Sequence, residues 1–311
     1  MTVRLTVPGN ILLMGEYAVL EEGGLGLAMA VETRVRLEAS PAPSLSIQGA
    51  WPGSSVSWAP EHRGTSPLVE AVVDTVSGWL GRPVTARVQV DSSAFFTPDG
   101  RKTGLGSSAA VSVALVCGLL RASGHPGPAP EAPGLALQAH RRAQAGRGSG
   151  YDVFTSFNGG SGIFRGGASP TWEPRAAGVD LEVLLFPGPA PVSTAESVSR
   201  YFEWKERNPG PAGEFLLESN RSILSFVRAD SPSDACTWLG ACRKLGIELG
   251  RSIGVPAELP VPAGLDPLWC KSVGAGNELG LCLLPRGAPL PADAPGARLV
   301  QRAETGVTWA E

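Results

Sequence analysis

Residues 3–20, 27–39 and 84–93 in the amino-terminal third predict strands, and the last of these segments alternates cleanly between apolar and polar positions. This alternation is typical of half-buried strands. Inside the first segment, Pro-Gly-Asn at residues 8–10 predicts a turn between two strands. Residues 181–188 form a short apolar run and predict a fully buried strand.

Apolar positions at a spacing of three and four residues predict helices at residues 66–80, 108–124, 135–146, 193–207, 212–229 and 234–250. The helix over 108–124 is apolar almost all round and is expected to be buried. Residues 147–167 predict a loop that enters a short helix or strand. Helices and strands in mixed order, without regular βαβ alternation, favour an α+β protein of two domains, with the boundary near residues 168–180.

The composition argues mainly against certain classes of function, such as binding to nucleic acid or to a membrane. The 311 residues carry a net charge of −3, which provides no basic surface for nucleic acid or an anionic membrane. The five cysteines form no CxxC pair, so we expect a reducing cytoplasmic location, with neither a zinc site nor a disulfide framework. The first residues alternate like a strand, so we expect no secretory signal, and no apolar run approaches the ~20 residues that span a bilayer.

The sequence KTGLGSSAAV, which begins at Lys102, is a candidate phosphate-binding loop. It lacks the Walker A spacing. Gly104 and Gly106 nevertheless permit backbone conformations that turn amide hydrogens toward one point. Ser107 and Ser108 fall at the start of the buried helix, where free N–H groups and the helix dipole favour an anion. The alternative is a tight turn in which Ser107 caps the helix.

Two further glycine-rich segments carry side chains suited to phosphoryl transfer. In GRGSGYD, residues 146–152, Asp152 follows a turn that allows close approach of the backbone to a ligand. A carboxylate there can orient or deprotonate an attacking oxygen, although a helix N-cap is the alternative for Asp152. In KSVGAGNELG, residues 271–280, the alternative is a plain loop before a strand.

The motifs PGNILLMGEYAVLEEGG, KTGLGSSAAV and KSVGAGNELG resemble, in this order, the three motifs of the GHMP kinases. Within that superfamily, AHRRAQAGRGSGYDV is similar to the phosphomevalonate kinases. The resemblance runs from Val7 to about Leu284. It implies an α+β fold with a ribosomal protein S5 domain 2-like N-terminal domain over residues 1–172, which carries the ATP-binding loop, and a ferredoxin-like α/β C-terminal domain over residues 173–311.

The resemblance also implies a role for each matching residue. Asp152 is the catalytic base or orienting group, and Lys102 is the cation that neutralises the transferred phosphoryl group. ATP is held by Gly104, Leu105, Gly106, Ser107, Ser108 and Ala109, and Ser108 is also the magnesium ligand. The acceptor is bound by Asn10, Glu16, Tyr17, Ser149, Gly150, Ser193, Thr194, Lys271, Ser272, Gly274, Ala275 and Gly276. His140 and Gln144 match a helix that faces this region, or that only packs there.

The implied reaction transfers the γ-phosphoryl group of ATP, with Mg²⁺, to 5-phosphomevalonate in the mevalonate route to isoprenoids. Asn10 stands where these kinases usually carry lysine, so Lys102 is expected to be the main cationic side chain. Asn277 and Glu278 replace two glycines of the third motif and should make that loop stiffer.

Two alternatives remain open. One is another GHMP kinase that acts on mevalonate, a sugar or another alcohol. The other is a member that binds a nucleotide or metabolite without turnover. The expected partner is a small phosphorylated or hydroxyl acceptor, with neither nucleic acid nor membrane, and the chain is expected to be a monomer or homodimer.

Overall fold

The computed structural model describes residues 2–52, 54–125, 127, 129–146, 148–176, 179–189, 192–287 and 296–310. The chain forms two compact units. Unit 1 comprises Met1–Ile11, Met29–Gly160 and Arg302–Glu311, and unit 2 comprises Leu12–Ala28 and Ser161–Gln301. The division differs from the single cut between residues 172 and 173 expected from the sequence. The long strands β1 (Val3–Met14) and β2 (Leu25–Ser40) both cross the boundary, and the segment that joins them belongs to unit 2.

The sheet of unit 1 has the strand order β12-β1-β2-β5-β3-β4. Its remaining strands are β3 (Ser46–Trp51), β4 (Ser54–Trp58), β5 (Arg87–Asp91) and β12 (Thr308–Ala310). β3 runs parallel to β5, whereas β12 pairs with β1, β5 with β2, and β4 with β3 in antiparallel fashion. The sheet therefore includes both termini of the chain as neighbouring strands.

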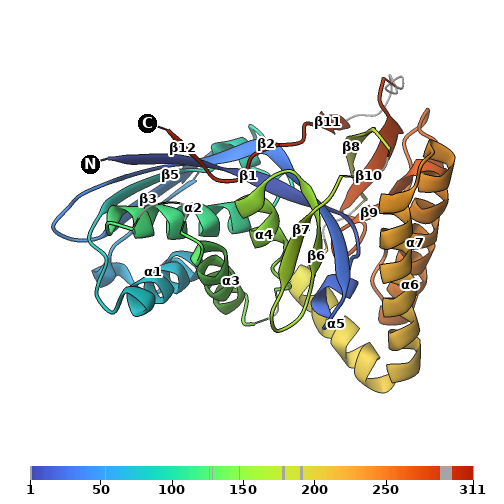
Figure 1. Ribbon diagram of the computed structural model, residues 1–311, viewed down its shortest axis with the longest axis horizontal. Helices are drawn as coiled ribbons and strands as arrows, with labels where there is room; N and C mark the ends of the chain where they lie inside the picture. The colour runs from blue at the N-terminus through green and yellow to red at the C-terminus, as the bar shows by residue number, and fades with distance from the viewer. Residues whose placement is uncertain are drawn as a thin grey trace. The chain divides into compact units, whose positions relative to one another are not determined.

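One face of this sheet is covered by helices α1 (Pro67–Leu80), α2 (Ser107–Ala122), α3 (Ala132–Ala143) and α4 (Tyr151–Asn158) (Figure 1). Helix α2 contacts α1, α3 and α4 and is buried along most of its length. The prediction of a buried helix over 108–124 is confirmed. Since α2 begins at the glycine loop, the most buried helix of unit 1 also positions the candidate phosphate site.

The turn predicted at residues 8–10 is wrong, because β1 continues through them as one strand. A Cβ atom on Gly9 would lie 2.5 Å from the carbonyl oxygen of Leu105 and 2.7 Å from the Phe95 ring. The glycine thus permits the loop before α2 to approach the strand closely, and the backbone amide of Asn10 donates to Leu105 O at 3.0 Å. Pro-Gly-Asn therefore lies within a strand and contacts the loop before α2, and it does not reverse the direction of the chain.

Unit 2 contains a four-stranded antiparallel sheet in the order β11-β8-β10-β9. Its strands are β8 (Leu181–Pro187), β9 (Cys270–Val273), β10 (Leu279–Pro285) and β11 (Arg298–Val300). The buried strand expected at residues 181–188 is confirmed as β8. The hairpin of β6 (Ser161–Arg165) and β7 (Thr171–Pro174) joins β2, so the predicted short helix or strand over 147–167 is both α4 and β6.

The helices of unit 2 are α5 (Thr194–Arg207), α6 (Pro209–Arg228) and α7 (Pro232–Ile253), as the periodicity predicted. Single 3-10 turns occur at Ala18–Leu20, Pro60–His62, Ser93–Phe95 and Pro267–Trp269. The fold is therefore α+β, as predicted.

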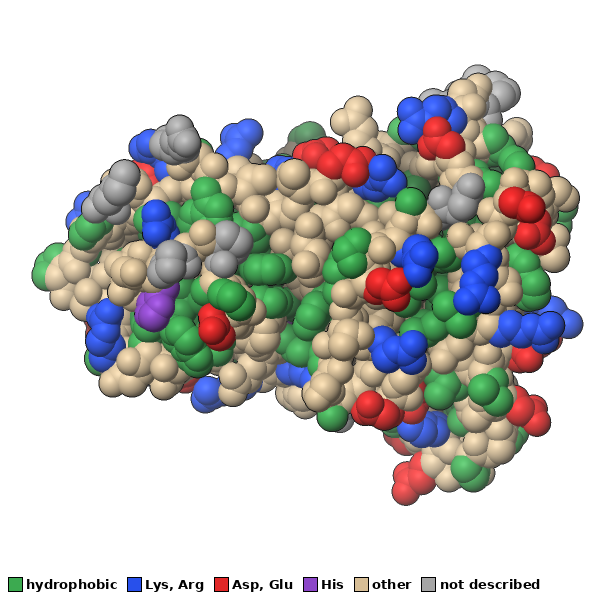
Figure 2. All heavy atoms as spheres, viewed as in Figure 1, with side chains coloured by type: hydrophobic (Ala, Val, Ile, Leu, Met, Phe, Trp, Pro, Cys, Tyr) green, Lys and Arg blue, Asp and Glu red, His purple; other side chains and the backbone are tan. Residues whose placement is uncertain are grey.

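The surface agrees with the small net charge. On the face shown in Figure 2, acidic and basic side chains are interspersed. Across the part of the chain that the structure describes, none of the helices has both the length and the apolar character needed to cross a membrane.

Candidate functional site

The glycine loop connects β5 to α2 and lies against β1. Gly104 and Gly106 have φ angles of 76° and 71°, in the left-handed region that favours glycine. A Cβ atom on Gly106 would lie 2.2 Å from Nδ2 of Asn10. Glycine is required at this position by its backbone conformation and by its neighbour. The alternative in which Ser107 caps the helix is wrong, because Gly106 is the capping residue and Ser107 begins α2.

The start of α2 can bind an anion. Among the described residues, no side chain caps this end of the helix. The backbone amide of Ala110 donates to Gly106 O, so the amides of Ser107, Ser108 and Ala109 precede the first intrahelical bond. Free amides at a helix N-terminus, together with the helix dipole, favour phosphate.

Asn10 contacts the glycine loop from strand β1. It is only 1% exposed, and its Nδ2 donates to Ser156 Oγ on α4 at 3.0 Å. The side chain therefore lies between the glycine loop and the helix that carries Asp152. The role in acceptor binding that the resemblance implied for Asn10 stays a prediction, and the contacts of this side chain within the chain are to the loop and α4.

Ser108, His140 and Asp152 form a chain of polar contacts across three helices. Ser108 Oγ lies 3.2 Å from His140 Nε2, and His140 Nδ1 lies 3.7 Å from Asp152 Oδ2. The carboxylate is the second residue of α4, and its Oδ1 accepts a hydrogen bond from the Val153 amide at 2.9 Å. Gly150 is the N-cap of α4, so the N-cap alternative for Asp152 is wrong. The predicted metal ligand and the predicted base are thus linked through one histidine.

Arg141 fixes the turn that precedes Asp152. Its Nε donates to Gly148 O at 2.9 Å and its guanidinium donates to Ser149 O at 2.8 Å. Burial lowers the pKa of Arg141, and the negative charge of Asp152 opposes that shift. Gly150, with φ of 96°, completes the turn beside Leu137. Ser149 and Gly150, predicted to contact the acceptor, are both buried in this turn.

Lys102 lies at the edge of a pocket in unit 1. The pocket has a volume of about 230 Å³ and is lined by Ser107 and Ser108 together with apolar side chains. The apolar part includes Ile47, Val56, Leu68, Val69, Phe96 and Val111. Lys102 itself is exposed. The structure therefore places the predicted cation, both serines of the loop and an apolar pocket side by side.

The remaining predicted acceptor residues gather in unit 2. Lys271 Nζ forms a buried ion pair with Glu16 and also donates to Ser272 O at 2.6 Å. Tyr17 donates its hydroxyl hydrogen to Ala275 O at 2.5 Å, and burial raises the pKa of this hydroxyl to about 12. The hydroxyl therefore remains a donor across the physiological pH range. These contacts join the Gly15–Tyr17 turn to the third glycine motif, and Lys271 is occupied by Glu16.

Other positions of unit 2 have local structural roles. Ser193 Oγ accepts a hydrogen bond from the Glu196 amide at 3.4 Å and caps α5, which begins at Thr194. Gly276 packs against Val192, where a Cβ atom would lie 2.8 Å away. Asn277, expected to stiffen the third motif, is buried and donates to Glu258 O at 2.9 Å.

The predicted residues thus form two groups. Unit 1 contains Asn10, Lys102, Gly104, Leu105, Gly106, Ser107, Ser108, Ala109, Ser149, Gly150 and Asp152, and unit 2 contains Glu16, Tyr17, Ser193, Thr194, Lys271, Ser272, Gly274, Ala275 and Gly276. Sequence reasoning left the role of His140 undecided and missed Arg141 and Ser156. The segment AHRRAQAG pointed to the helix, but no pattern indicated which of its side chains face the loop.

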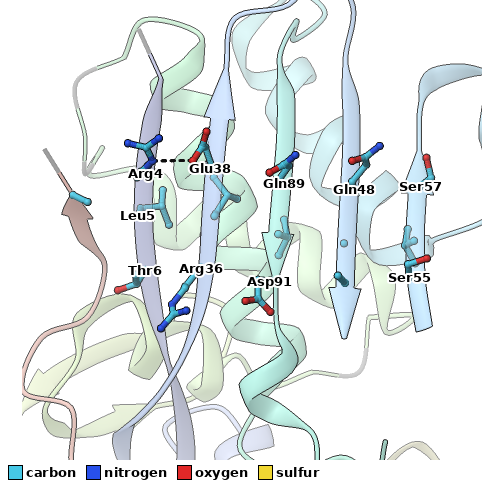
Figure 3. Close-up of a pocket in the computed structure, with 16 residues that line it drawn as sticks. Arg4, Leu5, Thr6, Arg36, Glu38, Gln48, Ser55, Ser57, Gln89 and Asp91 are labelled. Carbon is cyan, nitrogen blue, oxygen red and sulfur yellow. Dashed lines mark hydrogen bonds and ion pairs between the residues drawn. The ribbon is translucent and has the colours of Figure 1, made fainter. Parts of the chain in front are cut away.

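A wider depression of about 660 Å³ lies on the sheet of unit 1, away from these residues. Figure 3 shows rows of polar side chains across the strands, on the opposite face of the sheet from the helices. In one row Arg4 and Glu38 form an exposed ion pair beside Gln89, Gln48 and Ser57. Such rows are typical of a sheet face that is open to solvent.

A known protein family matches part of the chain. Residues 68–160 match the family described as GHMP kinases N terminal domain. Residues 68–160 are therefore a GHMP kinase N-terminal domain. This GHMP kinase domain includes α1, the glycine loop, His140 and Asp152, so the polar chain of unit 1 lies entirely within the matched region.

A curated relative is the phosphomevalonate kinase of Saccharolobus solfataricus, which is 31% identical over 156 residues. The alignment spans 49% of this chain and 46% of that protein, which is less than half of each.

Solved structures share the GHMP kinase fold over nearly the whole chain. A protein from Listeria innocua is 20% identical, with a TM-score of 0.79 and full coverage of both chains. A Streptococcus pneumoniae phosphomevalonate kinase in complex with phosphomevalonate and AMPPNP is 18% identical, with a TM-score of 0.70 and coverage of 90% and 92%. A Lactococcus lactis galactokinase is 13% identical, with a TM-score of 0.69 and coverage of 99% and 95%. The fold is thus shared by kinases that act on different acceptors.

Proposed function

We propose that this chain is an ATP-dependent kinase and that its acceptor is 5-phosphomevalonate. The observation that carries the kinase assignment is the glycine loop at the start of α2, whose Ser108 is linked through His140 to Asp152. The GHMP kinase domain supports the same assignment. The acceptor assignment is supported by the 31% identity to a phosphomevalonate kinase and by the residues AHRRAQAGRGSGYDV.

ATP binding would use the pocket beside Lys102 together with the free amides of α2. A volume of about 230 Å³ is below the range of pockets that enclose a whole drug-sized ligand. It suits one flat ring system held between apolar side chains, with the phosphates outside the pocket on the loop. Lys102 would then lie at the phosphate end, where its charge can offset charge on the transferred group.

The donors of unit 1 fit a magnesium ion that accompanies ATP. Mg²⁺ prefers oxygen ligands and usually takes only one or two from the protein, the rest coming from water and phosphates. Ser108 and Asp152 offer a hydroxyl and a carboxylate near the same histidine. Within the described residues, His, Cys, Asp and Glu form no group of three or more that could hold a metal on its own. A bound ion would neutralise negative charge on the phosphates.

The proposed reaction breaks the bond between the γ-phosphorus and the β,γ-bridging oxygen of ATP. A new bond forms from that phosphorus to a phosphate oxygen of the acceptor, and the products are ADP and a diphosphate. An ionised phosphate already carries a nucleophilic oxygen, so Asp152 would orient groups and balance charge more than remove a proton. The chain contributes mainly position and positive charge, through the loop amides and Lys102.

A coupled assay of ADP release tests this function. The acceptors are phosphomevalonate, mevalonate, galactose and homoserine, each with Mg²⁺ and ATP. We expect release with phosphomevalonate alone. Release only with mevalonate or galactose would overturn the acceptor and leave the kinase assignment intact. An absence of release with every acceptor, despite measurable ATP binding, would overturn the acceptor assignment and favour a binding protein that has lost turnover.

A hydroxyl acceptor is the second candidate, because the fold is also that of a galactokinase. It predicts a different use of Asp152, since a hydroxyl must lose a proton during transfer whereas a phosphate need not. Comparison of the solvent isotope effect on kcat for the active acceptor would distinguish the two, since only the hydroxyl reaction transfers a proton in the chemical step.

A further inference from the structure

His140 is a buried side chain whose contacts exceed what packing requires. It lies on α3 and is 1% exposed. Its Nε2 atom lies 3.2 Å from Ser108 Oγ and 3.2 Å from Gln144 Nε2. Its Nδ1 atom is buried and has no hydrogen-bond partner in the described part of the chain, and it faces Asp152 Oδ2 at 3.7 Å. Since buried polar atoms are normally paired, this arrangement requires an explanation.

The surroundings of the ring favour one tautomer. A carboxylate can only accept, so a hydrogen on Nδ1 is attracted to Asp152, whereas a lone pair there would be repelled. At the other nitrogen, the nearest atom of Gln144 is Nε2, which can only donate and needs an acceptor. Both neighbours therefore favour the tautomer with its hydrogen on Nδ1 and a lone pair on Nε2. In many histidine sites, the hydrogen bond made by one ring nitrogen determines whether the other nitrogen carries the hydrogen.

This tautomer determines how Ser108 can interact with a ligand. A serine hydroxyl has one hydrogen to donate and two lone pairs to accept. If Nε2 carries a lone pair, Ser108 and Gln144 both donate to it in a shared hydrogen bond, and only lone pairs then remain on Ser108 Oγ. Such an oxygen repels a phosphate oxygen but binds a cation. Phosphate would then be held by the loop amides, and the cation by Ser108.

We propose, on the basis of the proposed kinase function, that His140 is a positioning residue that keeps Ser108 as an acceptor. It thereby makes nucleotide binding at this loop depend on a divalent cation. A histidine that only fills space in the core would affect stability and leave the cation dependence of binding unchanged.

The test is calorimetric titration of the whole chain with a non-hydrolysable ATP analogue, once with Mg²⁺ and once with EDTA. The quantity compared is the ratio of the two affinities. We expect His140→Leu to reduce this ratio by about 10–100-fold, the usual effect of losing a partner of a metal ligand. His140→Gln should retain most of the ratio, because its amide oxygen can still accept from Ser108.

A double variant tests whether His140 acts through Ser108, because His140→Leu can be compared in the wild type and in a chain that carries Ser108→Ala. If His140 acts through Ser108, His140→Leu added to Ser108→Ala should not change the ratio further. Ser112→Ala, one turn along α2, is the control, because its hydroxyl donates to the backbone carbonyl of Ser108, and its ratio should equal that of the wild type. An unchanged ratio in a folded His140→Leu protein, or an equal further loss in the Ser108→Ala background, would overturn the proposal.

A measurement on a nearly native protein covers the case in which His140→Leu does not fold. The chain has three histidines, and His62 and His125 lie outside the buried core. With both replaced by glutamine, ¹⁵N NMR reports the tautomer of His140 directly. We expect the hydrogen on Nδ1, and a hydrogen on Nε2 would contradict the inference. Both experiments omit the acceptor, so a failed ADP assay leaves them informative, whereas a wild-type chain that binds no nucleotide contradicts the kinase function itself.

Discussion

Asp152 is partly exposed and lies beside His140 and Arg141. Its side chain is 20% exposed, faces His140 Nδ1 at 3.7 Å, and acts electrostatically on Arg141. Asp152→Asn preserves the shape and removes the charge. We expect kcat with the active acceptor to fall by at least ~10²-fold, as for the loss of an acid–base or orienting group. The control is Asp180→Asn, which removes an exposed ion pair with Arg286. Wild-type turnover in Asp152→Asn would exclude this carboxylate from the mechanism.

Asn10 shows why a lysine common at this position in related kinases does not suit this chain. The site is 1% exposed, and its amide lies between the backbone of Gly106 and the Ser156 hydroxyl. A lysine there would bury a charge with no carboxylate beside it among its described contacts. We expect Asn10→Lys to reduce the free energy of unfolding by about 2 kcal/mol or more, measured by urea denaturation.

The matched control is Asn158→Lys at the exposed end of α4, where surface substitution should change stability by less than about 0.5 kcal/mol. If Asn10→Lys instead kept the stability of the wild type and raised kcat, the lysine would have to reach the loop. The cationic role assigned to Lys102 would then need revision.

At the scale of elements, periodicity predicted every long helix and the buried strand β8, because each has one dominant apolar pattern. Prediction from the local pattern failed where the identity of a residue depends on a contact with a segment distant in the sequence. The local sequence around Gly9 predicts a turn. In the structure, the absence of a side chain at Gly9 allows Leu105, about ninety-five positions further along the chain, to approach the strand closely. The short edge strand β4 escaped detection because its five residues include three serines.

The start of α2 allows a direct test of the loop as an element. Gly106→Ala places a side chain at a φ of 71° and against Asn10. We expect a loss of more than about 1 kcal/mol in stability, because a residue with a Cβ atom is strained there, together with weaker binding of an ATP analogue. The control is Gly78→Ala inside α1, where a Cβ atom meets nothing within 4 Å. That change should stabilise the chain by about 0.5–1 kcal/mol. Equal effects of the two substitutions would contradict a special role for Gly106.

For the whole molecule, the sequence motifs identified the candidate residues but did not indicate which of the two units each residue belongs to. The first motif is divided, since Asn10 belongs to unit 1 and Glu16 to unit 2. The resemblance implied that Lys271 contacts the acceptor, and the structure pairs its charge with Glu16. Side-chain pairing of this kind depends on strands that meet only after folding. The sequence therefore predicted the position of the glycine loop at the start of a buried helix better than it predicted the pairing of each charged side chain.

The five cysteines test the compactness of both units together. All five are free thiols, and only Cys236 is partly exposed, whereas the other four are buried. Burial raises the pKa of Cys117 to about 12 and that of Cys242 to about 11, because it disfavours the thiolate. Alkylation requires the thiolate and access to it, so near neutral pH both factors protect the buried thiols.

We therefore expect iodoacetamide to modify Cys236 alone in the native chain and all five cysteines in denaturant, counted by mass spectrometry. Cys236→Ser is the control and should remove the native reaction. Rapid modification of a buried cysteine would mean that its unit opens far more readily than its packing indicates. Fewer than five modified thiols in denaturant without reductant would reveal a disulfide and contradict the reducing location inferred from the cysteine spacing.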